Sequence, residues 1–268
     1  MTAPSASRVD SSLPPELPRA ALVTGAGKRI GRAIALDLAA QGFAVAAHYN
    51  NSADAAASLV GEIEAAGGTA CALQADLGRE DQVMTLLPRA QQALGPIGLL
   101  VNNASTFELD KWDTADRDSW DRHMEPNLRA PFVLIQALGK ALPEDRQAVV
   151  VNLLDERVWN LTPFFVSYTL SKAGLWALTQ TMALALAPRI RVNGIGPGPT
   201  LPSPHQTQAQ FDNQTRAMPL QRGASPAEVC DAVRFILRAR AMTGQMIALD
   251  GGQHLAWAQS DHPDPRFL

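Results

Sequence analysis

The feature of this sequence that most constrains its fold is the regular alternation of short apolar runs with longer stretches of helical periodicity. The apolar runs are nearly continuous in Val, Ile, Leu and Ala, as expected for a parallel sheet that is covered on both faces. The predicted strands are Ala20–Thr24, Phe43–His48, Ala70–Gln74, Gly98–Asn102, Ala148–Leu153, Arg191–Ile195 and Met246–Leu249. The predicted helices are Ile30–Gln41, Ala53–Ala66, Glu80–Ala93, Leu128–Leu142, Leu170–Ala187 and Pro226–Arg240. This alternation predicts an α/β fold with a doubly wound parallel sheet of about seven strands and helices on both faces.

The predicted elements form one domain, residues 19–256, because no linker rich in Pro and Gly divides the pattern. Residues 1–18 are rich in Pro and Ser and lack the apolar core of a secretory signal, so we expect a flexible N-terminal arm. Residues 257–268 are expected to form a C-terminal tail. The segment 196–219 carries many prolines and polar residues, so a long regular element is not expected there. We expect a substrate loop in this segment, with a passive surface loop as the alternative.

Composition excludes several classes of function. The 268 residues carry a net charge of -3, which gives no basic footprint for nucleic acid. No apolar run approaches the roughly 18 residues that span a bilayer, so no membrane role is expected. The two cysteines, Cys71 and Cys230, lie far apart in the chain, and the five histidines lack metal-ligand spacing. We therefore expect buried thiols, no metal site and a reducing, cytoplasmic location.

A glycine-rich stretch, Thr24–Gly31, connects the first predicted strand to the first helix. Its glycines are separated by one and then three residues. Such a turn lets the backbone approach a pyrophosphate, which the N-terminus of the following helix stabilises. The predicted cofactor contacts are Gly25, Gly27, Lys28, Arg29, Ile30 and Gly31. Although a glycine turn can be only a tight connection, its place in the first βα unit favours a Rossmann-like dinucleotide site.

The end of the second predicted strand indicates which dinucleotide would bind. A site for NAD usually places a carboxylate there for the ribose hydroxyls. Here the predicted contacts are His48, Asn50, Asn51 and Ser52, and the first carboxylate is Asp54. Lys28 and Arg29 in the glycine turn supply cations for a 2′-phosphate, and the amide and hydroxyl groups supply neutral donors. The sequence therefore predicts NADP(H) rather than NAD(H).

Two further stretches follow predicted strands at the carboxyl edge of the sheet, where such folds bind ligands. Asp76 and Leu77 follow the third strand and could bound the adenine, or Asp76 could cap the next helix. Asn103, Ala104 and Ser105 follow the fourth strand and are predicted to contact the cofactor, to tie strand ends together, or both.

The chemistry is predicted to lie at Tyr168 and Lys172. These residues are four apart, so on a helix their side chains lie one above the other. An ammonium group beside a phenol favours the phenolate, so the pKa of Tyr168 is expected to fall towards neutrality. Tyr168 is then a candidate general acid for a substrate that receives hydride, and Lys172 could also contact the nicotinamide ribose. An ordinary pair on a helix surface is the alternative.

Together these stretches resemble the short-chain dehydrogenase/reductase family. The resemblance runs from about Ala20 to Leu255 and rests on TGAGKRIG, NNAS, EPNLRAPF, YTLSK, RVNGIGPG and TGQMIALDGG. It implies a homotetramer and catalytic roles for Asn127, Tyr168 and Lys172, with Asn127 holding a water of the proton relay. It also implies cofactor contacts at Pro197, Gly198 and Thr200, of which the first two would line the nicotinamide.

The sequence departs from the family pattern thirteen residues before the tyrosine, where Asp155 stands in place of a serine. An ionised aspartate only accepts hydrogen bonds and cannot donate to a carbonyl oxygen. Asp155 therefore suits a substrate with protonatable ring nitrogens, unless it is itself protonated or the chain is an inactive member. This variant, with GKRIGRAIA, HYNNSADAA and NNASTF, resembles the pteridine reductases and the related dihydromonapterin and dihydrofolate reductases. The resemblance implies that Phe107 stacks on the pterin and that Ser105 contacts the pterin or the cofactor phosphates.

The leading hypothesis is NADPH-dependent reduction of a C=N bond in a pterin or dihydrofolate-like substrate. Tyr168, Lys172 and Asp155 would control the proton, and Ser105, Phe107, Asp155 and Tyr168 would contact the substrate. A carbonyl reductase acting on a 3-oxoacyl thioester, a ketosteroid or a sugar is the enzymatic alternative. A cofactor-binding sensor is the alternative outside catalysis.

Overall fold

The computed structural model describes residues 13–203 and 206–255. Seven parallel strands form one sheet in the order β3-β2-β1-β4-β5-β6-β7. The strands are β1 Ala20–Val23, β2 Ala44–Tyr49, β3 Ala70–Gln74, β4 Leu99–Asn102, β5 Ala148–Leu153, β6 Ile190–Pro197 and β7 Met246–Leu249. This confirms the predicted α/β fold, since each predicted strand overlaps one of these strands.

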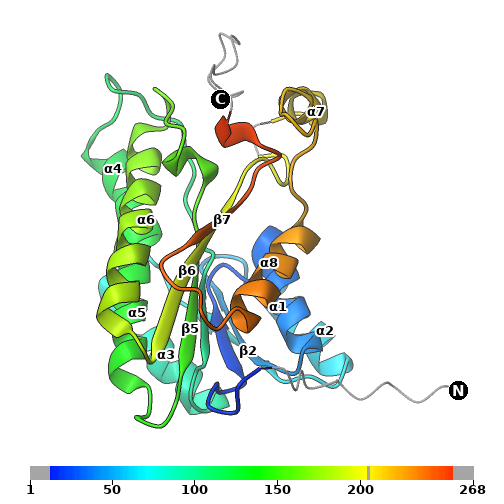
Figure 1. The fold of residues 1–268 in the computed structure, drawn as a ribbon, viewed down its shortest axis with the longest axis vertical. Coiled ribbons are helices and arrows are strands. Elements are labelled where there is room, and N and C mark those ends of the chain that lie inside the picture. The colour runs from blue at the N-terminus through cyan, green and yellow to red at the C-terminus, as the bar shows by residue number, and fades with distance from the viewer. Residues whose placement is uncertain (1–12, 204–205, 256–268) are drawn as a thin grey trace, which may run out of the picture.

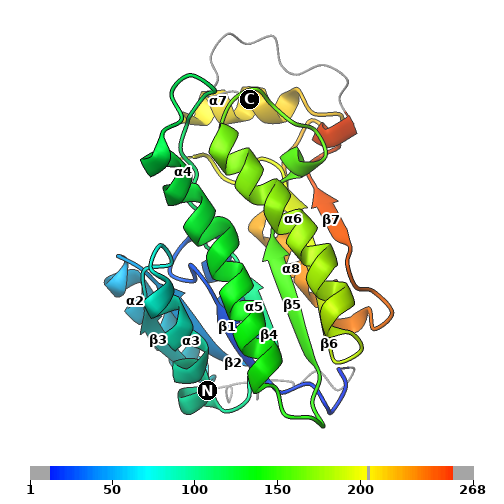
Figure 2. The ribbon, with the colours of Figure 1, turned by 90° about the vertical axis from the view of Figure 1, so that its left-hand side faces the viewer.

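Helices cover both faces of the sheet (Figures 1 and 2). They are α1 Arg29–Ala40, α2 Ala53–Ala65, α3 Glu80–Leu94, α4 Arg117–Met124, α5 Ala130–Ala141, α6 Val166–Leu186, α7 Gln208–Arg216 and α8 Pro226–Arg238. Short turns are the π-helical η1 Glu125–Arg129 and the 3-10 helices η2 Glu156–Val158 and η3 Gln253–Leu255. In Figure 1, α1, α2 and α8 lie on one face and α3, α5 and α6 lie on the other. None of the helices in the described ranges is long and apolar enough to cross a membrane.

The two layers are filled by alternate residues of the same strands. Leu99 and Val101 of β4 pack with α1 and α8, whereas Leu100 between them packs with α3 and α5. This alternation follows from the twofold periodicity of a strand, which sends successive side chains to opposite faces. It explains why apolar residues dominate the strands on both faces.

The structure contains helices that the sequence did not reveal. The polar helix α4 and the turn η1 precede α5, where the sequence predicted a helix from Leu128. In α4 only Ser119 and His123 are buried, so the helix has no apolar stripe, and a capping box between Asp116 and Ser119 starts it. The segment 196–219 likewise contains α7, none of whose residues is buried. The sequence excluded only a long regular element in this segment, and the short helix at 208–216 was not predicted.

The N-terminal prediction needs a correction at its end. Leu13 and Leu17 fall within the segment 1–18 that the sequence assigns to a flexible arm, yet both are buried in the core beside α8 and β1. Burial of these two leucine side chains stabilises an ordered conformation here, although the composition of the segment is rich in proline. Residues 1–12 and the predicted tail 257–268 lie outside the described residues.

Candidate active site

A pocket of about 250 Å³ opens at the carboxyl edge of the sheet. In Figure 2 the arrowheads of β5 and β7 point towards this end, where α7 lies. In a doubly wound sheet, ligands bind at this edge where the strand order reverses, which here is between β1 and β4. The predicted site residues that line the pocket are Arg29, Ile30, Asn103, Ser105, Phe107, Asp155, Tyr168, Lys172, Pro197, Gly198 and Thr200.

The glycine turn is shaped for close approach of an anion. Gly25 has a φ of +63°, a conformation that side chains disfavour, and a Cβ there would lie 3.0 Å from the Ala104 Cα. A Cβ on Gly31 would overlap the carbonyl oxygen of Gly25. The N-cap of α1, Lys28, makes no side-chain hydrogen bond to the helix. The first N–H groups of α1 are therefore left without a side-chain cap, which suits a pyrophosphate.

His48 takes part in this turn in a different way from the prediction. Its ring is buried, its Nδ1 accepts from the Gly25 N–H at 3.1 Å, and its Nε2 lies 3.0 Å from the Ala75 carbonyl oxygen. Both ring nitrogens of His48 thus interact with the backbone. The ring supports the glycine turn from the interior of the protein, and the prediction of a direct cofactor contact at His48 does not fit this position.

Groups that could reach a 2′-phosphate surround the mouth of the turn. Lys28, Asn50 and Asn51 are exposed, and Ser52 is half-buried with its hydroxyl beside Gly27, where a Cβ would lie 3.1 Å from the Ser52 Oγ. Arg29 is turned towards the segment after β6. Its guanidinium donates to the carbonyl oxygen of Pro202 at 2.8 Å and to that of Leu201 at 3.2 Å.

The residues after β3 and β4 have largely structural contacts. Asp76 Oδ1 accepts from the Gly78 N–H at 2.9 Å, and the N-cap of α3 is Arg79, so Asp76 does not cap that helix. Leu77 is buried. Asn103 donates from its amide to the Thr24 carbonyl oxygen at 2.8 Å, which ties the end of β4 to the end of β1.

Tyr168 and Lys172 lie on α6, as predicted, but their polar groups have other partners. The Tyr168 hydroxyl donates to Asp155 Oδ2 at 2.7 Å, and the Lys172 Nζ donates to the Leu153 carbonyl oxygen at 2.8 Å. The Lys172 Nζ lies 5.8 Å from the centre of the Tyr168 ring. Asp155 is therefore the direct partner of the phenol.

This arrangement corrects the predicted acidity of the tyrosine. Burial and the neighbouring Asp155 carboxylate raise the pKa of Tyr168 well above its ordinary value. Burial lowers the pKa of Lys172 to about 8. The spacing predicted that the ammonium group would lower the pKa of the phenol. Burial raises this pKa because it disfavours a charged phenolate, and Asp155 raises it because it disfavours a second negative charge beside its own.

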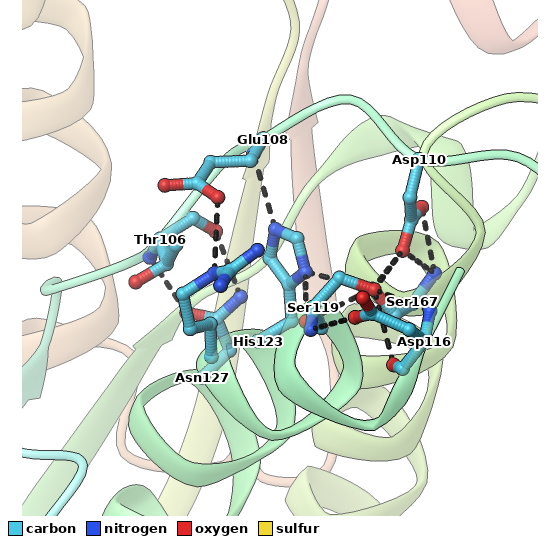
Figure 3. Close-up of polar contacts among 9 residues, drawn as sticks. Thr106, Glu108, Asp110, Asp116, Ser119, His123, Asn127 and Ser167 are labelled. Carbon is cyan, nitrogen blue, oxygen red and sulfur yellow. Dashed lines mark hydrogen bonds and ion pairs between the residues drawn. The ribbon is translucent and has the colours of Figure 1, made fainter. Parts of the chain in front are cut away.

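Asn127 is buried in the π-helical turn η1 and holds the loop after β4 (Figure 3). Its Oδ1 accepts from the Thr106 N–H at 2.8 Å, and its Nδ2 donates to the Thr106 carbonyl oxygen and the Ser171 hydroxyl, both at 3.0 Å. Both amide hydrogens are thus used within the protein. The side chain of Asn127 has no donor left for the predicted relay water.

An aromatic wall completes the pocket. The rings of Phe107 and Phe165 are stacked with centroids 4.5 Å apart and an interplanar angle of 9°, and the edge of Tyr168 meets Phe107 at 4.7 Å. Phe107 remains 38% exposed. The Arg157 guanidinium lies 5.2 Å from the centre of the Phe107 ring. Ser105 is exposed on the same loop.

Comparison with known proteins decides the family. The sequence profile described as short chain dehydrogenase matches residues 19–214. The chain belongs to this short-chain dehydrogenase family. Its 3-oxoacyl-[acyl-carrier-protein] reductase relative from Staphylococcus epidermidis is 33% identical over 244 residues, which cover 88% of this chain and 99% of the relative.

Two solved structures of the short-chain dehydrogenase fold are more similar in sequence. One is the FolM alternative dihydrofolate reductase 1 from Brucella suis in complex with NADP, 52% identical with a TM-score of 0.87, covering 90% of this chain and 97% of that one. The Brucella canis protein, also complexed with NADP, is 50% identical with a TM-score of 0.89, covering 92% and 99%. These findings support the predicted dihydrofolate reductase-related subgroup.

The short-chain dehydrogenase site also contains residues that the sequence reasoning missed. Glu156 and Arg157 line the pocket beside Asp155, and Phe165 stacks on the ring of Phe107, which lines it. Glu156 is only 4% exposed, and burial together with the Asp155 charge raises its pKa to about 8. The charged run 155–157, which begins two positions after the end of β5, was the available signal, because that strand end opens into the ligand edge.

Proposed function

We propose that this chain is an NADPH-dependent reductase that reduces a C=N bond in a pterin or dihydrofolate-like substrate. The observation that carries the proposal is the 2.7 Å hydrogen bond from the Tyr168 hydroxyl to Asp155. The Brucella proteins, which are alternative dihydrofolate reductases with NADP bound, support it through 52% and 50% identity.

The residues around the pocket fit NADP(H). The uncapped start of α1 and the glycines before it would hold the pyrophosphate, and Lys28, Asn51 and Ser52 would hold the 2′-phosphate. Lys172 would contact the nicotinamide ribose, and Pro197, Gly198 and Thr200 would line the nicotinamide side of the pocket. When bound, NADPH supplies the hydride.

The chain's own residues control the proton. Reduction of a C=N bond adds a hydride to carbon and a proton to nitrogen, so the site needs a group that keeps its proton until the substrate arrives. The raised pKa of Tyr168 keeps the phenol protonated. Transfer of that proton to a ring nitrogen leaves a phenolate, which the Lys172 ammonium group stabilises, and solvent protonates it again.

Asp155 selects the kind of substrate. As a carboxylate it accepts a hydrogen bond from the Tyr168 hydroxyl and can accept others from the N–H groups of a pterin ring. It cannot donate a hydrogen bond to a carbonyl oxygen. The partly exposed ring of Phe107 offers a flat surface on which a heteroaromatic ring stacks.

One observation favours the carbonyl reductase alternative. The Staphylococcus relative at 33% identity is a 3-oxoacyl-[acyl-carrier-protein] reductase. Against that activity stands Asp155, because a ketone needs a hydrogen-bond donor at that position. Tyr168 and Lys172 both line the pocket, which argues against a sensor without chemistry.

Oxidation of NADPH, followed by its absorbance, tests the proposal with dihydrobiopterin, dihydromonapterin and dihydrofolate beside acetoacetyl thioester. We expect turnover of at least one of the three nitrogen heterocycles and little turnover of the ketone. Turnover of the ketone with none of the heterocycles would overturn the proposal. The homotetramer and the cytoplasmic location stay predictions, of which light scattering of the purified protein tests the first.

A further inference from the structure

Figure 3 shows a buried polar network whose members are not among the residues that line the pocket. It consists of Asp110 on the loop after β4, Ser119 and His123 on α4, and Ser167 at the start of α6. All four side chains are buried, and those of His123 and Ser167 are 0% exposed. The mechanism proposed above uses none of them.

The hydrogen bonds fix the tautomer of His123. The Glu108 N–H lies 3.0 Å from its Nε2, and because a backbone N–H can only donate, Nε2 is the acceptor. The ring proton is therefore on Nδ1, which lies 2.7 Å from the Ser167 Oγ and 2.9 Å from the Ser119 carbonyl oxygen. Burial lowers the pKa of His123, which favours this neutral form.

The network continues from the imidazole to a carboxylate. The Ser167 hydroxyl donates to Asp110 Oδ2, and the Ser167 N–H donates to Asp110 Oδ1 at 3.2 Å. The Asp110 carbonyl oxygen accepts from the Phe165 N–H at 2.8 Å. The order is histidine, serine, carboxylate, and the serine hydroxyl donates its hydrogen bond to the carboxylate. This arrangement does not activate Ser167 as a nucleophile.

The two ends of the network lie next to two residues of the proposed site. Glu108, at the Nε2 end, directly follows Phe107, and Ser167, at the Nδ1 end, directly precedes Tyr168. The His123 ring also meets the Tyr168 ring edge to face with centroids 6.0 Å apart. A single imidazole thus connects the backbone beside the stacking aromatic with the backbone beside the proton donor.

We propose that His123 is a positioning residue that acts on the two sides of the reaction separately, with its Nε2 end setting Phe107 and its Nδ1 end setting Tyr168. The inference rests on the proposed function of the pocket. It goes beyond that function by assigning substrate stacking and proton transfer to the two ends of one buried side chain. A purely structural network would affect both steps together, through stability alone.

Two substitutions separate the ends of the imidazole. His123→Asn keeps a donor at the δ position for Ser167 and loses the acceptor for Glu108, so we expect the KM for the dihydropterin to rise about tenfold with kcat within about twofold. His123→Gln keeps an acceptor at the ε position and loses the donor for Ser167. We expect kcat to fall about tenfold with KM within about twofold. Neither variant should change the KM for NADPH.

Ser167→Ala and Leu86→Ala complete the experiment. Ser167→Ala removes the partner of Nδ1 and should reproduce the fall in kcat, which keeps the test available if a histidine variant does not fold. Leu86 is a buried residue of α3 away from the pocket, so Leu86→Ala controls for lost stability and should leave both constants unchanged. Equal changes of kcat and KM in His123→Asn and His123→Gln, or no change in either, would overturn the proposal.

The outcome stays separate from that of the proposed function. If the unmodified enzyme reduces acetoacetyl thioester and no dihydropterin, the proposed function fails. The kcat and KM of the histidine variants are then measured with the thioester. A split between the two constants supports the positioning role on that substrate, and its absence overturns it.

Discussion

Replacing Glu156 with glutamine tests the electrostatics of the pocket most sharply. Burial and the Asp155 charge raise the pKa of Glu156 from an ordinary 4.5 to about 8. Between these two pH values the unfolded chain has lost the proton that the folded chain keeps. The contribution of Glu156 to stability therefore falls as pH rises from 4.5 to about 8, by up to about 1.4 kcal/mol for each pH unit. Glutamine is neutral throughout, so Glu156→Gln does not lose stability in this way.

The size of the effect follows from the same two pKa values. The free energy of unfolding of Glu156→Gln should exceed that of the unmodified protein by about 1 kcal/mol at pH 5, about 3 kcal/mol at pH 7 and about 4 kcal/mol at pH 8. Urea unfolding at these three pH values and one fixed protein concentration measures it.

Glu144 provides the matched control because it is exposed on the surface. Glu144→Gln should change the free energy of unfolding by less than about 0.5 kcal/mol at each pH. A Glu156→Gln protein whose stability difference is the same at pH 5 and pH 8 would refute the reasoning. Lower stability than the unmodified protein at pH 7 would do so as well.

Three further predictions concern the chemistry and the cofactor. Burial lowers the pKa of Lys172 to about 8. As pH rises through this value the ammonium group loses its charge, so kcat/KM should fall. A kcat/KM that stays constant up to pH 9.5 would contradict this prediction. Tyr168→Phe should lower kcat by about 10²-fold or more while NADPH fluorescence titration gives an unchanged Kd, and near-normal kcat would remove Tyr168 from the proton transfer. Gly31→Ala should weaken NADPH binding at least about tenfold, because its Cβ would overlap the Gly25 carbonyl oxygen. An unchanged Kd would contradict the proposed role of the glycine turn in binding the cofactor.

Local patterns in the sequence predicted local geometry well. The glycine turn was predictable because the φ of Gly25 and the start of α1 are decided within a few residues. The strands were predictable because each is a short run in which apolar residues dominate. The helix α4 was missed because its residues are polar and only two of them are buried.

Partners from other elements decided what the sequence could not predict. The spacing of Tyr168 and Lys172 placed both on one helix, but the partner of Lys172 is the carbonyl oxygen of Leu153 on β5. That contact exists only after the sheet has formed. Likewise His123 and Ser167 lie on two different helices and are 44 positions apart in the chain, so no periodicity relates them.

We propose that Asp155 makes a nitrogen heterocycle, and not a ketone, the substrate of this pocket. Replacing Asp155 by serine, the residue that the family resemblance predicts at this position, tests this proposal directly. The measurement is the ratio of kcat/KM for dihydrofolate to kcat/KM for acetoacetyl thioester, in the unmodified enzyme and in Asp155→Ser. We predict that the substitution lowers this ratio by about 10²-fold or more, because the carboxylate partner of the Tyr168 hydroxyl is lost while a donor for ketones is gained. An unchanged ratio would contradict the account.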